Sequence, residues 1–239
     1  MRRAVAFLTP FGRAATPTDT TLAWFSLVGA LIGFAVGGLW WLAAKIWVAL
    51  LAGAVAVAVD LALTGLLHFD GLADAGDGLL APLTRERRLA AMADPLIGAF
   101  GALIVGAVLL LRFGAFATLR PTPLVIAGLW CASRTAMVAV TEALPYARSD
   151  GLVTSFLGAG SGVHRIVVRG SVVVGVALSV ALVVVGRGAR GLVALAAELL
   201  GIVLVALFSR RRIGGYTGDV LGAAGVIGET IGLLVLAVR

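Results

Sequence analysis

Apolar runs of similar length, separated by short polar segments, make up most of this sequence. Each run has 19 to 25 residues, close to the roughly 20 residues that a helix needs to cross a hydrocarbon core of about 30 Å. None shows the ten-residue alternation that is typical of strands in a membrane barrel. The pattern therefore predicts about seven transmembrane helices. Their expected ranges are 20–44, 46–67, 96–118, 122–144, 166–186, 191–209 and 219–238.

The composition agrees with an integral membrane protein. Of the 239 residues, 61% are hydrophobic and only 13% are charged, and the mean hydropathy is +1.09. A water-soluble domain of this size would need a more polar surface. The 32 glycines favour close helix packing, because lipid gives helices no hydrophobic drive to associate. We expect one all-α domain, residues 1–239, built as a polytopic transmembrane helical bundle.

The distribution of positive charge predicts the orientation of this bundle. With the N-terminus inside, twelve of the 19 Lys and Arg residues lie in inner segments, six lie in outer segments, and one lies within a span. The positive-inside rule then places the N-terminus in the cytoplasm and the C-terminus outside. The polar segments 68–95, 145–165 and 210–219 all fall on the cytoplasmic side, where we expect the active site. The scattered arginines form no basic, aromatic-interleaved face for nucleic acid.

The stretch HFDGLADAGDG, residues 68–78, concentrates acidic residues in a chain that has only 12. Asp70, Asp74 and Asp77 have the spacing i, i+4, i+7, which places them within about 60° of one another on one face of a helix. Three carboxylates this close repel one another, so a cation between them would stabilise the cluster. Oxygen ligands favour Mg²⁺, which commonly shares its coordination with substrate phosphates. A solvated helix end with ordinary surface aspartates is the alternative.

Two features of the same stretch refine this interpretation. His68 is the only nearby nitrogen ligand, which disfavours zinc. It could bind phosphate, orient a carboxylate or move a proton, and an ordinary interfacial histidine is an equal alternative. The glycines between the aspartates weaken the helix but would let phosphate groups approach its backbone. These glycines are Gly71, Gly76 and Gly78.

Basic and acidic residues in the other polar segments are further candidates. Arg85, in RERR, could attract an anionic substrate or grip anionic lipid. Arg148 is an anion-binding candidate in the next polar segment. Asp94 precedes Pro95 and the third span, where it could cap the helix, or act as a metal ligand or general base.

The stretch GGYTGD at the start of the last span combines glycines with a hydroxyl and a carboxylate. Its backbone N–H groups could hold a phosphate while Asp219 reaches the metal. The residues expected to contact the phosphate are Gly215, Thr217 and Gly218.

Taken together and in order, these motifs resemble the cobalamin synthase family of adenosylcobinamide-GDP ribazoletransferases. The resemblance covers nearly the whole chain, and rests on FSLVGALIG, HFDGLADAGDGLL, RERRLAAMADPLIGAFG, PYARSDGL and GGYTGDVLGA. One departure is Pro95 and Leu96, where the family usually has a serine and a basic residue. The resemblance implies a Mg²⁺-dependent, multi-pass enzyme of the bacterial inner membrane. This enzyme would join adenosylcobinamide-GDP to α-ribazole or its 5′-phosphate and release GMP.

Within that reaction we expect Asp70, Asp74, Asp77 and Asp219 to hold Mg²⁺, and Asp94, or alternatively His68, to act as general base. Arg85, Arg148, Gly215, Thr217 and Gly218 are the expected substrate contacts. The expected partners are the two substrates and the lipid bilayer, and a homo-oligomer stays open. A membrane transporter and a CDP-alcohol-type phosphotransferase are the alternatives. The D-G-x-x-A-R arrangement of the phosphotransferase is absent, because Asp70 and Gly71 are followed by Leu72, Ala73 and Asp74.

Overall fold

The computed structural model describes residues 1–11, 20–148 and 162–238. Within these ranges the regular structure is helical, apart from one isolated bridge between Tyr146 and Tyr216. The all-α prediction is therefore confirmed. The elements are α1 (Arg2–Leu8), the short 3₁₀ helix η1 (Leu22–Trp24), α2 (Phe25–Ile46), α3 (Ala49–Leu63), α4 (Leu67–Leu79), α5 (Arg85–Ala91), α6 (Ala99–Thr118), α7 (Pro123–Ala143), α8 (Gly162–Ile213) and α9 (Gly218–Leu236).

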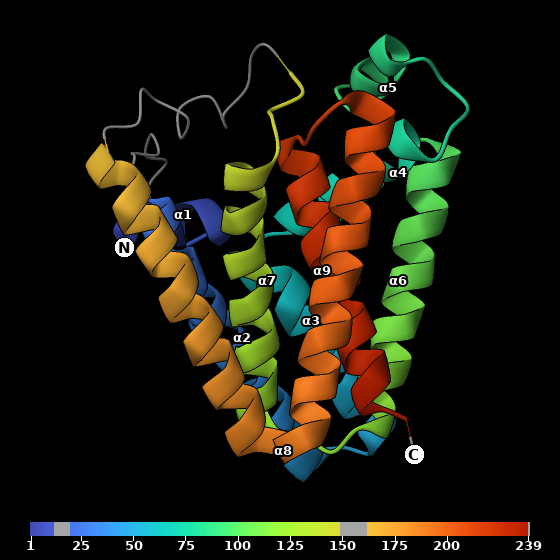
Figure 1. The fold of residues 1–239 in the computed structure, drawn as a ribbon. Coiled ribbons are helices and arrows are strands. Elements are labelled where there is room, and N and C mark those ends of the chain that lie inside the picture. The colour runs from blue at the N-terminus through green and yellow to red at the C-terminus, as the bar shows by residue number, and fades with distance from the viewer. Residues whose placement is uncertain (12–19, 149–161, 239) are drawn as a thin grey trace.

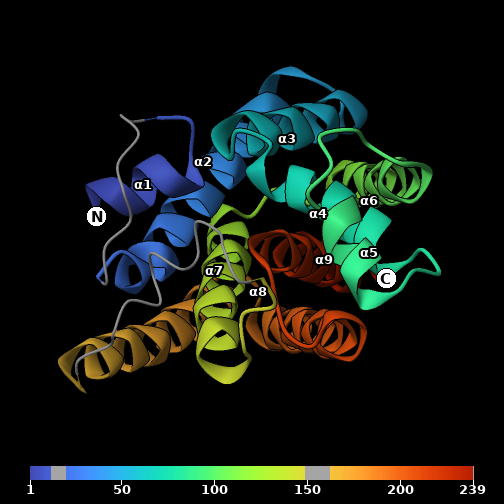
Figure 2. The same cartoon turned by 90° about the horizontal axis from the view of Figure 1, so that it is seen from above.

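The long helices stand side by side as a bundle (Figure 1). α7 and α9 lie in its middle when the bundle is seen from above (Figure 2), and most residues of α7 are buried. Helix α8 reverses direction at Gly188, which has the non-helical angles φ 56° and ψ −135°. Its arms, 162–187 and 189–213, occupy the positions predicted for the fifth and sixth spans.

The structure does not have a single straight helix over the predicted span 46–67. Helix α3 has only 15 residues, and the chain then bends by 88° into α4. Gly65 and Leu66 make this bend with positive φ angles of 57° and 63°. Leucine rarely adopts such angles, so the sequence gives little warning of the bend. The helix that carries the three aspartates is therefore a separate element.

Five helices of the described ranges are long and apolar enough to cross a membrane, or six if the bent pair α3–α4 counts as one span. Both counts are lower than the predicted seven, because each treats α8 as one helix. A count of seven follows if the bent pair α3–α4 counts as one span and the two arms of α8 are also taken separately.

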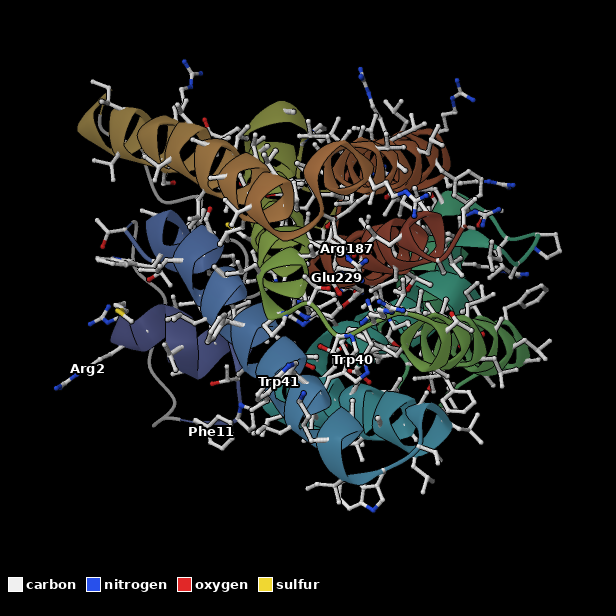
Figure 3. All side chains as sticks on the ribbon, turned by 90° about the horizontal axis from the view of Figure 1, so that it is seen from below. Arg2, Phe11, Trp40, Trp41, Arg187 and Glu229 are labelled. Carbon is white, nitrogen blue, oxygen red and sulfur yellow. The ribbon has the colours of Figure 1, made fainter. Side chains whose placement is uncertain are left out.

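Four charged side chains from four different helices meet in the interior of the bundle. Arg112 of α6 donates to Asp60 of α3 and to Glu229 of α9, both at 2.5 Å. Arg134 of α7 also donates to Glu229. Glu229 lies in the middle of the bundle when it is viewed from the opposite end (Figure 3). The pairing compensates the cost of burying these charges in a low-dielectric environment and joins the four helices.

Candidate active site

Helices α4 and α9 approach each other closely where the acidic residues lie. A Cβ atom at Gly71 would lie 2.9 Å from the backbone oxygen of Asp219 and 3.0 Å from its Cα. One helical turn further along α9, a Cβ at Gly222 would lie 3.3 Å from the Cα of His68. Because these glycines have no side chain, α4 and α9 can pack closely. Asp70 and Asp219, which are far apart in the sequence, therefore line the same cavity.

The other two glycines of α4 also serve helix packing. Gly76 faces α6, where an added Cβ would lie 2.7 Å from Ile104 and 3.1 Å from Gly101. Gly78 faces Met92, whose side chain would lie 2.2 Å from an added Cβ. These two faces are occupied by protein, so the expectation that glycines open the α4 backbone to phosphate is wrong for Gly76 and Gly78, whereas Gly71 lines the first cavity described below.

The three aspartates of α4 share one helix, as expected, but they have different partners. Both carboxylate oxygens of Asp77 accept hydrogen bonds from α6: one from the backbone N–H of Gly98 at 2.7 Å, the other from Gly101 at 2.9 Å. Asp77 thus caps the N-terminus of α6 from a neighbouring helix. Asp74 is partly exposed and Asp70 is exposed.

Asp94 does not cap the third span, because Asp77 occupies that role. Its carboxylate instead accepts a hydrogen bond from the backbone N–H of Leu96 at 2.9 Å and closes a local turn. The residue is exposed and is not among the residues that line the two cavities described below.

Two loops hold Arg148 beside Asp219. The backbone N–H of Tyr216 donates to the oxygen of Pro145 at 3.0 Å, and that of Ala147 donates to the oxygen of Tyr216 at 2.8 Å. This pairing lets the Arg148 guanidinium reach the Asp219 carboxylate at 3.0 Å and the backbone oxygen of Met92 at 3.1 Å. The ion pair is partly exposed, so it contributes little to the stability of the protein. Its importance is that it holds the Arg148 guanidinium beside the Asp219 carboxylate.

The predicted phosphate-binding stretch at the start of α9 has mixed roles. A Cβ at Gly215 would lie only 2.0 Å from the oxygen of Pro145, so glycine is needed for the loop pairing. Thr217 is buried and caps α9, because its hydroxyl accepts from the N–H of Val220 at 3.3 Å and donates to Asp219 at 3.2 Å. Gly218 lies at the first position of α9 and lines the first cavity.

A cavity of about 310 Å³ lies among α1, α2, α4, α7 and the start of α9. Its lining includes five of the predicted site residues: His68, Asp70, Arg148, Gly218 and Asp219. Most of the wall is apolar and comes from residues that the sequence analysis did not select. These include Phe7 and Leu8 of α1, Phe25 of α2, Met137 and Val138 of α7, and Leu221 of α9.

Two tyrosines of the paired loops also line this cavity and were missed. Tyr146 and Tyr216 pack edge to face with ring centroids 5.5 Å apart. Burial raises the pKa of both phenols, that of Tyr216 to about 12. The position of Tyr216 inside GGYTGD, next to the candidate phosphate contacts, was the one signal that could have indicated it.

A second, open cavity of about 480 Å³ lies between α5 and the segment that precedes residue 149. Arg85, Glu86 and Arg148 are its charged lining residues. The Nε of Arg85 donates to the backbone oxygen of Ile213 at 2.8 Å, which fixes the side chain at the end of α8. Arg148 lines both cavities, and it therefore stands at the junction between an apolar chamber and an exposed, basic one.

The carboxylates at this junction provide hard oxygen donors. In the described part of the chain, no three His, Cys, Asp or Glu side chains form a group that could hold a metal ion by themselves. Mg²⁺ characteristically takes one or two carboxylates and fills its other positions with water and substrate phosphates. Asp70 and Asp219 on the wall of one cavity fit that smaller requirement.

Comparisons with known proteins agree on one family. The family model described as cobalamin-5-phosphate synthase matches residues 1–237. Three relatives named adenosylcobinamide-GDP ribazoletransferase illustrate the similarity. The relative from Chlorobium phaeobacteroides is 32% identical over 234 residues, which cover 96% of this chain and 92% of the relative. That from Citrobacter koseri is 36% identical over 217 residues (89% and 85%), and that from Bradyrhizobium diazoefficiens 36% over 247 residues (99% and 92%).

No solved structure shows a significant match to the chain. The family match spans nearly all of the sequence, including every element that lines the two cavities. The chain therefore belongs to the cobalamin-5-phosphate synthase family.

Proposed function

We propose that this protein transfers the cobinamide phosphate of adenosylcobinamide-GDP to α-ribazole or its 5′-phosphate, with release of GMP, late in cobalamin biosynthesis. Family membership and the names of the relatives support this reaction over the transporter and CDP-alcohol alternatives. The structural observation that carries it is Arg148, paired with Asp219 at the junction of two unlike cavities. A transfer between two substrates needs a phosphate-binding group at the point where their sites meet.

In the proposed reaction, a hydroxyl oxygen of the nucleoside forms a bond to the phosphorus on the cobinamide side of the pyrophosphate. The bond between this phosphorus and the oxygen of GMP breaks, and GMP leaves as an anion. The Arg148 guanidinium binds the phosphate oxygens on which negative charge increases, through charge-assisted hydrogen bonds. Arg85 lines the open cavity, where its position suits the nucleotide part of the donor.

The proton of the attacking hydroxyl needs an acceptor, for which we favour His68 over Asp94. His68 lines the same cavity as Asp70 and Asp219, whereas Asp94 is exposed and engaged in its own turn. The Nδ1 atom of His68 is buried and has no hydrogen-bond partner among the described residues. An unprotonated Nδ1 could accept the hydroxyl proton as the new bond forms.

Asp70 and Asp219 would hold Mg²⁺, with Asp74 on the same helix face as a further ligand. The ion would neutralise pyrophosphate charge and orient the leaving GMP. The proposal gives Asp77 a structural role, because both its oxygens already accept hydrogen bonds from α6. This end of the bundle would lie on the cytoplasmic side of the bacterial inner membrane, where the nucleotide substrate is available.

The direct test uses purified protein in liposomes, supplied with adenosylcobinamide-GDP, α-ribazole 5′-phosphate and Mg²⁺. Chromatography should detect GMP and a complete corrinoid in equal amounts. An Arg148→Gln variant should lose most of this activity while keeping its thermal unfolding temperature, because Arg148 lies in a partly exposed ion pair. Folded wild-type protein that releases no GMP would contradict the proposed function.

A further inference from the structure

The apolar cavity has a wall unlike that of a typical phosphate site. Phe7, Leu8, Phe25, Met137, Val138 and Leu221 form a hydrophobic chamber, and charged residues gather at Asp70, Arg148 and Asp219. Phe7 of α1 stacks on Phe25 of α2 with ring centroids 5.8 Å apart, so α1 forms part of the chamber wall. Cavities of this kind bind flat apolar groups, and a few polar atoms fix the orientation of the ligand.

Two residues that line this chamber each carry a buried polar atom without a hydrogen-bond partner in the described part of the chain. The two atoms are the hydroxyl oxygen of Tyr216, in a residue that is 0% exposed, and Nδ1 of His68, in a residue that is 4% exposed. Leaving such atoms unpaired is costly, and a bound ligand can supply the missing partners. With its pKa raised to about 12, the Tyr216 hydroxyl remains a donor at any physiological pH.

We infer that this chamber binds the benzimidazole base of the acceptor nucleoside, with the Tyr216 hydroxyl donating to the unsubstituted ring nitrogen and His68 facing the nucleoside hydroxyls. The inference rests on the proposed function, and adds which cavity takes which substrate. A dimethylbenzimidazole has a flat apolar body and a single free ring acceptor. An apolar chamber in which the Tyr216 hydroxyl is a donor without a partner among the described residues matches these properties.

The other substrate fits the chamber poorly. A volume of about 310 Å³ is at the small end of ligand sites and cannot enclose a corrin ring with its amide side chains. Guanine would bring several polar edge atoms into a wall made mostly of hydrocarbon, where they would lose their hydrogen bonds to water. The open cavity beside Arg85 and Arg148 suits the guanosine diphosphate instead.

A consequence for specificity follows from the same chemistry. A purine base adds polar ring atoms that the chamber leaves unpaired, so an adenine nucleoside should be a weaker acceptor than α-ribazole. An indole analogue with the same shape lacks the ring nitrogen and should lose the hydrogen bond to Tyr216 alone.

The test measures binding and turnover separately. Isothermal titration of α-ribazole into the purified full-length protein, without the second substrate, should give a Kd that rises about 3- to 10-fold in Tyr216→Phe. Wild type should prefer α-ribazole to the indole analogue by a similar factor, and Tyr216→Phe should bind both equally. The KM for adenosylcobinamide-GDP should stay unchanged in this variant.

A second pair of variants tests the chamber by its volume. Leu221→Trp fills the chamber and should weaken α-ribazole binding by more than 10-fold, whereas Leu103→Trp alters a side chain of α6 that is 73% exposed and should have no effect. Unchanged α-ribazole binding in folded Leu221→Trp, or a rise only in the KM for adenosylcobinamide-GDP, would overturn the inference while GMP release still upheld the proposed function. A wild type that binds α-ribazole nowhere and releases no GMP would refute both.

Discussion

Asp77 accepts a hydrogen bond from the backbone N–H of Gly98 at 2.7 Å, and its second oxygen accepts one from Gly101 at 2.9 Å. Asp77, the last of the three aspartates on α4, thus holds the start of α6 against α4. A negative charge at a helix N-terminus also interacts favourably with the helix dipole. Asp77 therefore has a structural role, although the spacing of Asp70, Asp74 and Asp77 in the sequence does not distinguish it from the other two.

This contact predicts that Asp77→Ala lowers the stability of the protein by about 1 to 2 kcal/mol, because it removes both acceptors of the α6 cap. Asp94→Ala is the matched control. It removes an exposed carboxylate that closes only a local turn, and should change stability by less than about 0.5 kcal/mol. Thermal unfolding of the purified proteins in detergent would measure both, and equal stability in the two variants would argue against the cap.

The close contact of α4 with α9 predicts a steric effect at Gly71. Gly71→Ala places a methyl group about 3 Å from the Asp219 backbone, and should cost about 1 to 3 kcal/mol while it pushes Asp70 away from Asp219. Gly106→Ala, on α6 with nothing within 4 Å, should be neutral or slightly stabilising. Unfolding temperature and GMP release should both fall in the first variant alone. A fully active Gly71→Ala protein would show that the two helices need not approach so closely.

Three features can be predicted from the sequence because each depends on a local pattern. They are the all-α class, the position of the polar segments at one end of the bundle, and the helix that carries Asp70, Asp74 and Asp77. The sequence does not predict contacts that depend on packing. The bend at Gly65 and Leu66 needs a left-handed leucine, which no local preference indicates. The role of Asp77 depends on the approach of α6, and the chamber wall depends on α1, whose residues carry no recognisable motif.

The buried ion pairs show the same limit: the sequence indicates charges that must pair, but not which ones. Arg112 satisfies Asp60 and Glu229 together, so Arg112→Leu should destabilise the protein by about 3 to 5 kcal/mol. Adding Asp60→Asn removes one of the unpaired charges and should recover part of that loss. Arg120→Leu, at an exposed position, is the control and should have little effect. Additive losses in the double variant would mean that Asp60 does not depend on Arg112.

The position of the C-terminus predicts the membrane topology. Helix α9 begins beside the candidate site and ends at the opposite end of the bundle (Figure 1). If the site faces the cytoplasm, as the excess of inner Lys and Arg predicts, alkaline phosphatase fused after Arg239 should be active and a green fluorescent protein fusion there should be dark. The reverse pattern would place the site outside the cell and contradict the proposed orientation.

The last prediction separates the aspartates that serve chemistry from the one that serves folding. Asp70→Asn, Asp74→Asn and Asp219→Asn each remove a negative charge with little change of shape, and should cut turnover by about 10²-fold, a barrier increase of about 2.7 kcal/mol. Asp70 and Asp219 line the cavity and have neither of the helix N-terminal contacts of Asp77, so their variants should remain folded. Wild-type turnover should stop in excess chelator and return with Mg²⁺, and Zn²⁺ should substitute poorly for it among carboxylates.

Asp77→Asn provides the internal comparison. It keeps one oxygen acceptor for the α6 cap, so its loss of activity should follow its loss of stability and disappear at low temperature. A turnover defect in folded Asp77→Asn as large as that of Asp70→Asn would instead return Asp77 to the metal site. Normal turnover in folded Asp70→Asn, Asp74→Asn and Asp219→Asn would mean that the acidic residues at this junction are not needed for chemistry, and that phosphate transfer depends on Arg148 and its neighbours alone.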